Sequence, residues 1–228
     1  MEIIPHVHRI PGVRGAEAYL VTQGRPALVD TGMPGNAERI LAYVQEVGLA
    51  PGDLARIVLT HYHIDHIGSA AALKELTLAR VAAHPGDAPY ISGEQPQPAP
   101  RGALMRLLTR LLPMMSRVDP VAVDLPLADG ERLDLLGGAT VIHVPGHTPG
   151  AVALHFPAEG LLICGDAISH RGGRLGPPPA AFTVHQEQAY ASLRRLAALE
   201  FEVLCAGHGE PITSGADRQV RALARTLD

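Results

Sequence analysis

The nine residues 60–68, with the sequence THYHIDHIG, constrain this chain more than any other stretch. Three histidines and one aspartate fall within six positions, directly after the apolar run 55–59 that we interpret as the end of a buried strand. Neighbouring imidazoles that take up protons repel each other, so soluble proteins rarely collect them in this way. A divalent cation that binds neutral imidazole nitrogens and a carboxylate oxygen explains such a cluster. The alternative is a histidine-rich surface loop with adventitious metal affinity.

The spacing of these side chains predicts two ion sites. Residues i and i+2 at the end of a strand point the same way, so we expect His61 and His63 to bind one ion. If the chain then turns into a helix, Asp65 and His66 leave in another direction and reach a second ion close by. Residues 68–76 supply the predicted helix.

Length and composition exclude several classes of protein. The chain of 228 residues suits one domain, and its hydrophobic content of 46% with 18% charged residues is ordinary for a globular enzyme. The net charge of −4 provides no basic surface for nucleic acid. We find neither a membrane-spanning run nor a secretory signal, and the two cysteines make no disulfide framework. We therefore expect a cytoplasmic protein in which Cys164 and Cys205 are small buried hydrophobes.

The periodicity of apolar residues predicts alternating strands and helices. Predicted strands cover residues 18–22, 27–30, 55–59, 79–83, 121–125, 139–144, 151–156, 161–164 and 202–205. Predicted helices cover residues 36–47, 68–76 and 185–199.

A compositional break at about 89–118 separates the two halves and predicts a helical insertion. Residues 89–100 contain four prolines and predict a loop, and residues 101–115 predict an apolar and basic helix. Its role stays open between a pocket wall, a dimer contact, a membrane-surface contact and ordinary packing. The loop 171–179, rich in Pro and Gly, is expected at the rim of the site.

Three further metal-binding side chains stand beside glycines at the ends of predicted strands. They are His147 in VPGHTPG, Asp166 in LICGD and His208 in LCAGHG. Glycine permits the close backbone approach that converging ligands need. Each of these signals is weak alone, but together with residues 61–66 they form a specific pattern.

The order HxHxDH, then His, Asp and His, resembles that of the metallo-β-lactamase-fold superfamily. The resemblance extends from residues 19–21 and 29–32 to His208 and covers most of the chain. It implies an α/β fold of the α+β kind, a four-layered αββα sandwich with the metals at one edge of its two sheets. The alternation of strands and helices is compatible with that fold.

The resemblance also implies a role for each ligand by its position in this sequence. The first metal would take His61, His63 and His147, the second would take Asp65, His66 and His208, and Asp166 would bridge them. Asp30 would orient a ligand imidazole; the alternative role for Asp30 is to cap the turn that follows it. Two ions of this kind generate a bridging hydroxide near neutral pH and polarise the oxygen under attack. Asp65 would be the catalytic group that orients this nucleophile or receives a proton.

Zinc is the first expectation for both ions, with manganese, iron and cobalt also accepted by these ligands. His170 and His84 are weaker candidates for the substrate pocket, because polar residues collect at loop ends in any case. We expect a small-molecule substrate, no nucleic acid and no stable membrane association, and a homodimer stays open.

Differences between this sequence and known types of the family reduce the number of activities to be expected. Related β-lactamases place a cysteine where this chain has Asp166, and ribonuclease-type phosphodiesterases carry a more basic surface. Hydroxyacylglutathione hydrolases share the seven ligands but add a C-terminal helical region, whereas only residues 209–228 follow His208. Lactone hydrolases share both the ligands and the compactness. We therefore expect hydrolysis of a lactone, carboxylic ester or thioester. The alternative is a persulfide dioxygenase with one iron on His61, His147 and Asp166.

Overall fold

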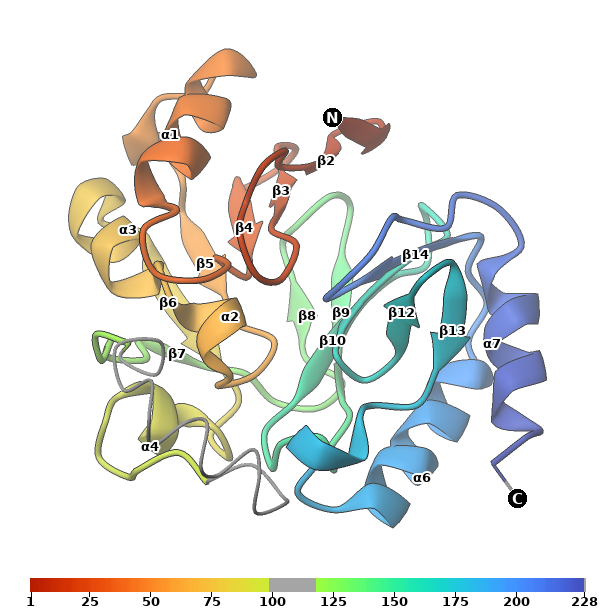
Figure 1. Cartoon of the computed structure of the whole chain (residues 1–228). Helices are drawn as coiled ribbons and strands as arrows, with labels where there is room; N and C mark the ends of the chain where they lie inside the picture. The colour runs from red at the N-terminus through yellow and green to blue at the C-terminus, as the bar shows by residue number, and fades with distance from the viewer. Residues whose placement is uncertain (99–117, 228) are drawn as a thin grey trace.

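Two β-sheets pack face to face in the computed structural model, which describes residues 1–98 and 118–227 (Figure 1). The larger sheet has the order β1-β2-β3-β4-β5-β6-β7 and the smaller one β14-β11-β10-β9-β8. The larger sheet consists of β1 (Glu2–Ile4), β2 (Val7–Arg9), β3 (Tyr19–Val21), β4 (Ala27–Val29), β5 (Arg56–Val58), β6 (Arg80–Ala83) and β7 (Leu125–Pro126). The smaller one consists of β8 (Arg132–Leu133), β9 (Ala139–His143), β10 (Val152–Phe156), β11 (Leu161–Gly165) and β14 (Val203–Ala206).

Helices cover the outer face of each sheet (Figure 1). The helices are α1 (Ala37–Glu46), α2 (Ile64–Ile67), α3 (Ala70–Thr77), α4 (Ala88–Ile91), α6 (Gln186–Ala197) and α7 (Ala216–Ala224), with 3-10 turns at Pro51–Asp53 and Ala180–Phe182. Helices α1 and α3 pack on the larger sheet, and α6 and α7 pack on the smaller one.

The alternation of side chains along the strands builds these layers, because successive residues point to opposite faces. In β3, Tyr19 and Val21 join the core between the sheets, whereas Leu20 packs with α1 and α3. In β11, Leu161 and Ile163 face the larger sheet and Leu162 faces α6. Both faces of each sheet are therefore buried, as the predicted four-layered αββα sandwich requires.

The parallel strands bring the predicted ligands to one region. Strands β4, β5 and β6 pair in parallel, so their carboxyl ends lie at the same edge of the larger sheet. Asp30 follows β4 there, and His61 comes three residues after β5. Strands β11 and β14 are also parallel, and Asp166 and His208 follow their carboxyl ends.

Two predictions of regular structure, around the motif and in the insertion, need adjustment. The helix predicted for residues 68–76 is α3, which begins at Ala70, whereas the short helix α2 before it was not predicted; Gly68 and Ser69 separate the two. A side chain at Gly68 would lie 2.4 Å from the Pro34 ring, so the chain passes too close for any other residue. The loop predicted for 89–100 begins within α4, where Pro89 stands in the first turn that tolerates proline.

Two further stretches differ from the prediction. Of the strand predicted for residues 121–125, only Leu125 pairs with β6, together with Pro126 just beyond the predicted range, and Val121 packs into the outer core beside the helices instead. The predicted loop 171–179 contains half of a hairpin, β12 (Ser169–Arg171) with β13 (Arg174–Gly176). Its turn is made by two glycines in the left-handed region, Gly172 at φ +58° and Gly173 at φ +74°.

Strands β1, β2 and β8 and helix α7 were not predicted. The predicted helix 101–115 and most of the insertion lie outside the described residues, so the insertion and the single-domain organisation stay predictions. Within residues 1–98 and 118–227, we find no helix with the length and apolar character needed to cross a bilayer.

Candidate metal centre

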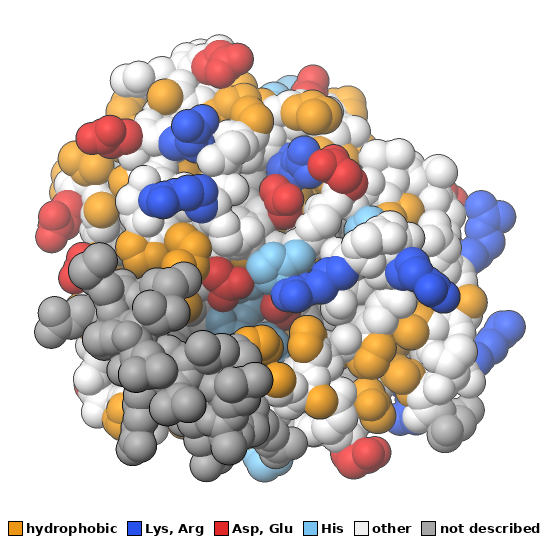
Figure 2. Space-filling model, viewed as in Figure 1, with side chains coloured by type: hydrophobic (Ala, Val, Ile, Leu, Met, Phe, Trp, Pro, Cys, Tyr) orange, Lys and Arg blue, Asp and Glu red, His pale blue; other side chains and the backbone are white. Residues whose placement is uncertain are grey.

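All seven predicted ligands lie together where the strand ends of the two sheets meet. Their donor atoms form three overlapping groups, each with every donor within 4.8 Å of the others: His61, His63 and His147; His61, His66 and Asp166; and Asp65, His66 and His208. Figure 2 shows imidazole and acidic side chains at the bottom of a hollow on this face of the molecule.

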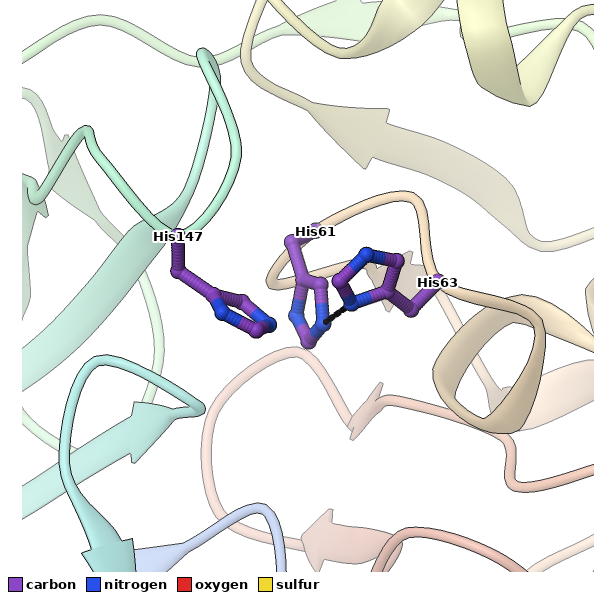
Figure 3. Close-up of side chains that lie close together, drawn as sticks. All are labelled: His61, His63 and His147. Carbon is purple, nitrogen blue, oxygen red and sulfur yellow. Dashed lines mark hydrogen bonds between the residues drawn. The ribbon is translucent and has the colours of Figure 1, made fainter. Parts of the chain in front are cut away.

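The first group collects three imidazoles from two loops (Figure 3). His61 Nε2 lies 3.0 Å from His63 Nδ1. The centroid of the His147 ring lies 4.8 Å from that of the His61 ring and 4.6 Å from that of the His63 ring. His61 extends from the end of β5, and His63 is the residue that precedes α2. One short stretch of chain and the loop after β9 therefore form a three-nitrogen site.

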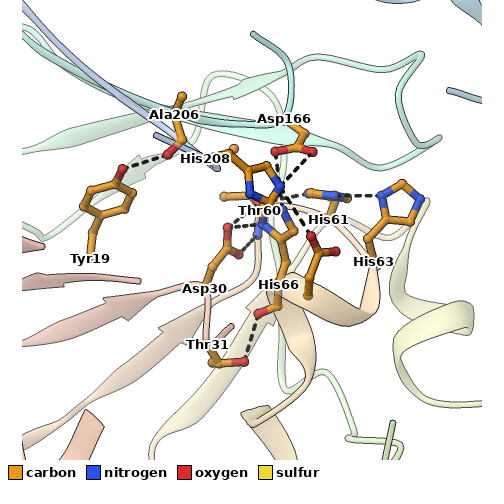
Figure 4. Close-up of polar contacts among 12 residues, drawn as sticks. Tyr19, Asp30, Thr31, Thr60, His61, His63, His66, Asp166, Ala206 and His208 are labelled. Atoms are coloured by element: carbon orange, nitrogen blue, oxygen red, sulfur yellow. Dashed lines mark hydrogen bonds and ion pairs between the residues drawn. The ribbon is translucent and has the colours of Figure 1, made fainter. Parts of the chain in front are cut away.

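The remaining predicted ligands surround the Asp166 carboxylate, which is labelled in Figure 4. Asp166 Oδ1 lies 3.4 Å from His66 Nε2, and Oδ2 lies 3.7 Å from His147 Nε2 and 3.6 Å from His208 Nε2. His208 Nε2 is also 3.3 Å from Asp65 Oδ2. Asp166 thus faces residues of both predicted ligand sets.

Asp30 and Thr60 determine which ring nitrogens face the centre. The Asp30 carboxylate lies 2.7 Å from His66 Nδ1 and accepts a bond of the same length from the Thr60 hydroxyl. Because that hydroxyl donates to Asp30, it accepts from Nδ1–H of His61, 3.1 Å away. His61 then carries its proton on Nδ1 and presents an unprotonated Nε2 to a cation. His66, bound to Asp30 through Nδ1, would present its Nε2 once a cation has replaced the proton there.

Thr183 orients His147 in the same way. Its hydroxyl donates to the Pro179 carbonyl at 2.9 Å and lies 3.3 Å from His147 Nδ1. The ring therefore donates from Nδ1 and leaves Nε2 facing Asp166. Thr183 follows the 3-10 turn Ala180–Phe182, and the Phe182 ring stands 6.5 Å from that of His63.

The three-histidine group is neutral. Burial, together with the other imidazoles, lowers the pKa of His61 well below its ordinary value. Burial also lowers the pKa of His63 to about 3, with His147 adding to the effect, and lowers the pKa of His147 to about 4. Metal ligands must be deprotonated, so these rings are ready to bind at neutral pH.

The carboxylate-rich group holds protons that a cation would replace. Burial opposes charge on His66, but the Asp30 and Asp166 carboxylates outweigh it and raise the pKa of His66 well above its ordinary value. Burial likewise opposes charge on His208, yet the Asp166 and Asp65 carboxylates beside it raise the pKa of His208 to about 9. These two rings balance the negative charge that a divalent ion would otherwise neutralise.

Three buried imidazole nitrogens without hydrogen-bond partners indicate that these residues suit a metal ion. The buried Nε2 atoms of His66, His147 and His208 have no hydrogen-bond partner of good geometry. Buried polar atoms are normally paired, so three such nitrogens around one carboxylate need an explanation. Divalent cations on these donors provide one, and imidazole with carboxylate is a ligand set that zinc, manganese, iron and cobalt accept.

The two weaker pocket candidates make their contacts elsewhere. His170 Nδ1 lies 2.8 Å from the Glu210 carbonyl, a bond that attaches the ring to the segment after His208. His84 stacks on His143 with 3.9 Å between the ring centroids and accepts a bond from the Gly86 N–H. None of these contacts involves one of the seven ligands.

The sequence reasoning missed three residues that hold the site. Thr60 had a visible signal, since it directly precedes His61 and follows a buried strand. Thr183 and Asp87 had none, because each reaches the ligand loops only through the tertiary fold. Asp87 is fully buried, and its carboxylate contacts both loops that carry the three-histidine group.

Comparison with known proteins decides the family. The sequence model of the metallo-beta-lactamase superfamily matches residues 11–208, a stretch that contains all seven ligands. The chain belongs to this superfamily. Its strand order, helical layers and ligand cluster agree with that membership, which supports the activity class of a metal-dependent hydrolase.

Three similar proteins illustrate the relationship. A probable metallo-hydrolase of Bacillus subtilis, YflN, is 32% identical over 82% of this chain and 76% of its own length. A hydroxyacylglutathione hydrolase of Pseudomonas aeruginosa is 38% identical over 78% of this chain but only 54% of its own, so the match spans about half of that enzyme. The crystal structure of a metallo-beta-lactamase family protein from Thermus thermophilus is 30% identical, with a TM-score of 0.75 over 99% of this chain and 79% of that one.

Proposed function

We propose that this protein is a dinuclear metal-dependent hydrolase that attacks the carbonyl of an ester-type substrate, a small thioester, carboxylic ester or lactone. The observation that carries the proposal is the position of Asp166 between the two predicted ligand sets, with its carboxylate 3.4–3.7 Å from three imidazole nitrogens. Among the three substrates we place thioesters first, because hydroxyacylglutathione hydrolases are among the relatives with the highest identity.

The residues would hold the ions as the sequence predicts. His61, His63 and His147 offer a neutral site, and Asp65, His66 and His208 offer an anionic one, with Asp166 shared. Two bound divalent cations, zinc first, would lower the pKa of a shared water and polarise the carbonyl oxygen under attack. No serine or cysteine nucleophile is then required, and both cysteines are buried away from solvent.

Asp65 is the proposed catalytic residue. Its side chain is 31% exposed and lies in contact with His208, so it is the more accessible of the two carboxylates in the cluster. Burial opposes ionisation, but the interaction with His208 lowers the pKa of Asp65 to about 2. An ionised carboxylate at the open side of the site is able to orient the attacking water and to receive a proton after attack.

Metal analysis and a substrate panel test this proposal. The stripped protein is reconstituted with zinc, manganese, iron or cobalt and assayed with a glutathione thioester, aryl esters, lactones, phosphodiesters and a β-lactam. We expect about two ions per chain and the highest kcat/KM on an ester-type carbonyl. One iron per chain with oxygen consumption and no hydrolysis would instead identify the persulfide dioxygenase, which needs only His61, His147 and Asp166. Faster turnover of the phosphodiester or the β-lactam would also contradict the proposal.

A further inference from the structure

Asp87 is a fully buried carboxylate to which the proposed hydrolysis assigns no role. It follows β6 and stands at the position that precedes α4, where aspartate normally accepts a hydrogen bond from the first turn of the helix. Here the side chain makes no such capping bond. Its oxygens turn instead toward the two loops that carry the three-histidine group.

Three hydrogen bonds connect Asp87 to these loops. Its Oδ2 accepts from the Tyr62 N–H at 3.0 Å and from the Thr148 hydroxyl at 2.7 Å. Its Oδ1 accepts from the Gly150 N–H at 2.6 Å. Tyr62 lies between His61 and His63 in the chain, and Thr148 directly follows His147. One carboxylate therefore joins the peptide between two ligands to the loop that bears the third.

Close backbone contacts around Asp87 restrict the position of its carboxylate. A side chain at Gly150 would lie 2.4 Å from the Asp87 backbone nitrogen and 2.8 Å from its Oδ1, so the loops pass as close as a glycine allows. The Tyr62 carbonyl accepts a bond from Gln97 Nε2 at 2.8 Å. The segment after β6 thus holds the backbone of Tyr62 on both sides: Asp87 accepts from its N–H, and Gln97 donates to its carbonyl.

We propose that Asp87 is a positioning residue of the metal centre, whose carboxylate sets the distance of His147 from His61 and His63 and so the affinity of the three-histidine site for its cation. The inference rests on the metal centre of the proposed function but not on its substrate. A backbone bond from the Val152 N–H to the Thr60 carbonyl, 2.9 Å, already aligns the strand ends. Loss of Asp87 would therefore displace the ligand loops more than the sheets.

Asp87→Asn is the variant that tests this role, because it keeps the shape of the side chain and removes its charge. The amide retains one acceptor for Gly150, and the Thr148 hydroxyl is free to reverse, but the Tyr62 N–H loses its acceptor. Asp124→Asn is the matched control, since Asp124 also accepts a backbone N–H of β6, from Val81 at 2.8 Å, and binds Lys74 outside the ligand loops.

The measurement is competition titration of Co²⁺ and Zn²⁺ against a chelator, well below the melting temperature of each variant. Outer groups that support metal ligands typically contribute about 10–100-fold in affinity, so we expect a loss of that size in one of the two binding steps of Asp87→Asn. The visible absorption of bound Co²⁺ should change with it. Asp124→Asn should keep the wild-type affinities and spectrum even if its melting temperature falls.

Thr148→Val provides a second variant that removes one of the three donors. We expect a smaller loss in the same binding step, about fivefold, and a double variant no weaker than Asp87→Asn alone. Wild-type metal affinity and an unchanged Co²⁺ spectrum in folded Asp87→Asn would overturn the proposal. So would equal losses in Asp124→Asn. If the unaltered protein binds fewer than two ions, the proposed dinuclear function fails instead, and the two failures are distinguishable.

Discussion

The two halves of the chain build the metal centre in different ways. The N-terminal half supplies four predicted ligands from residues 61–66, a single turn from β5 into α2. The C-terminal half supplies one predicted ligand from each of three separate places, His147 after β9, Asp166 after β11 and His208 after β14. The contribution of residues 61–66 is local and can be recognised as a sequence motif. The three C-terminal residues come together only when the smaller sheet has formed.

The difference extends to charge. The three-histidine group is buried and neutral, because burial outweighs every nearby carboxylate. The group around Asp166 combines carboxylates with protonated imidazoles, and its His208 and Asp65 side chains are 21% and 31% exposed. A neutral imidazole site beside a carboxylate-rich site that holds protons should respond differently to substitution and to pH.

The largest expected effect comes from Asp166→Ala, since both ligand sets share this carboxylate. We expect kcat/KM to fall by about 10³-fold or more, roughly 4 kcal/mol of transition-state stabilisation, in a protein that stays folded. His66→Ala should also abolish hydrolysis, whereas Asp53→Ala, on the far turn Pro51–Asp53, should leave it unchanged. Steady-state kinetics with metal content measured by atomic emission checks this. Normal turnover in both ligand variants would exclude a two-metal mechanism.

A smaller effect should follow from the groups behind the rings. Asp30→Asn removes the negative charge 2.7 Å from His66 Nδ1, and asparagine tolerates the positive φ of 59° at this position. We expect metal affinity to fall by about 10–100-fold. Thr183→Val removes only a neutral hydroxyl 3.3 Å from His147 and should cost less. Equal losses in the two variants, measured by chelator competition, would show that charge does not distinguish the halves.

The pH dependence of metal binding should separate the two sites. His208 has a pKa of about 9 in the metal-free protein, so below pH 9 a cation must displace its proton. Affinity of the carboxylate-rich site should therefore rise with pH between 6 and 9, by up to tenfold per unit for each proton released. His63 and His147, with pKa values of about 3 and 4, are already neutral imidazoles in this range and have no second proton to lose, so their site should vary little. Identical pH slopes for the two binding steps would contradict this assignment.

The smallest effect concerns the strands behind the C-terminal ligands. Cys164 and Cys205 are buried in β11 and β14, and burial raises the pKa of each thiol well above its ordinary value. We expect neither thiol to react with an aromatic disulfide reagent at pH 8 until denaturant unfolds the chain, because the thiolate is the reactive form. Rapid labelling of the folded protein would show that these strand ends open more readily than the packing indicates.

Periodicity predicted most of the strands in both sheets, because each combines several apolar residues with flanking turns. It missed β1, β2 and β8, whose short strands lack a clear apolar run. It did not predict α2 as a helix apart from α3, since the separation at Gly68 depends on the close passage of Pro34, a residue that the motif does not contain. The hairpin β12–β13 appeared as a glycine-rich loop for a similar reason: the glycines are the turn, and its strands are only three residues each.

Residue types and spacing alone predicted the ligand set, because few arrangements of His and Asp have any explanation other than a cation, and the structure brings these seven residues together. They also determined the family, since the motifs recur in the same order along the chain. Tertiary structure decided which nitrogen each ring presents, through Asp30, Thr60 and Thr183, and how the two loops of the three-histidine site are joined, through Asp87. Most of these contacts link residues far apart in the chain. Asp30 meets Thr60 through the pairing of β4 with β5, and Asp87 meets Thr148 through the packing of one sheet on the other, so these contacts depend on tertiary structure rather than on any local pattern.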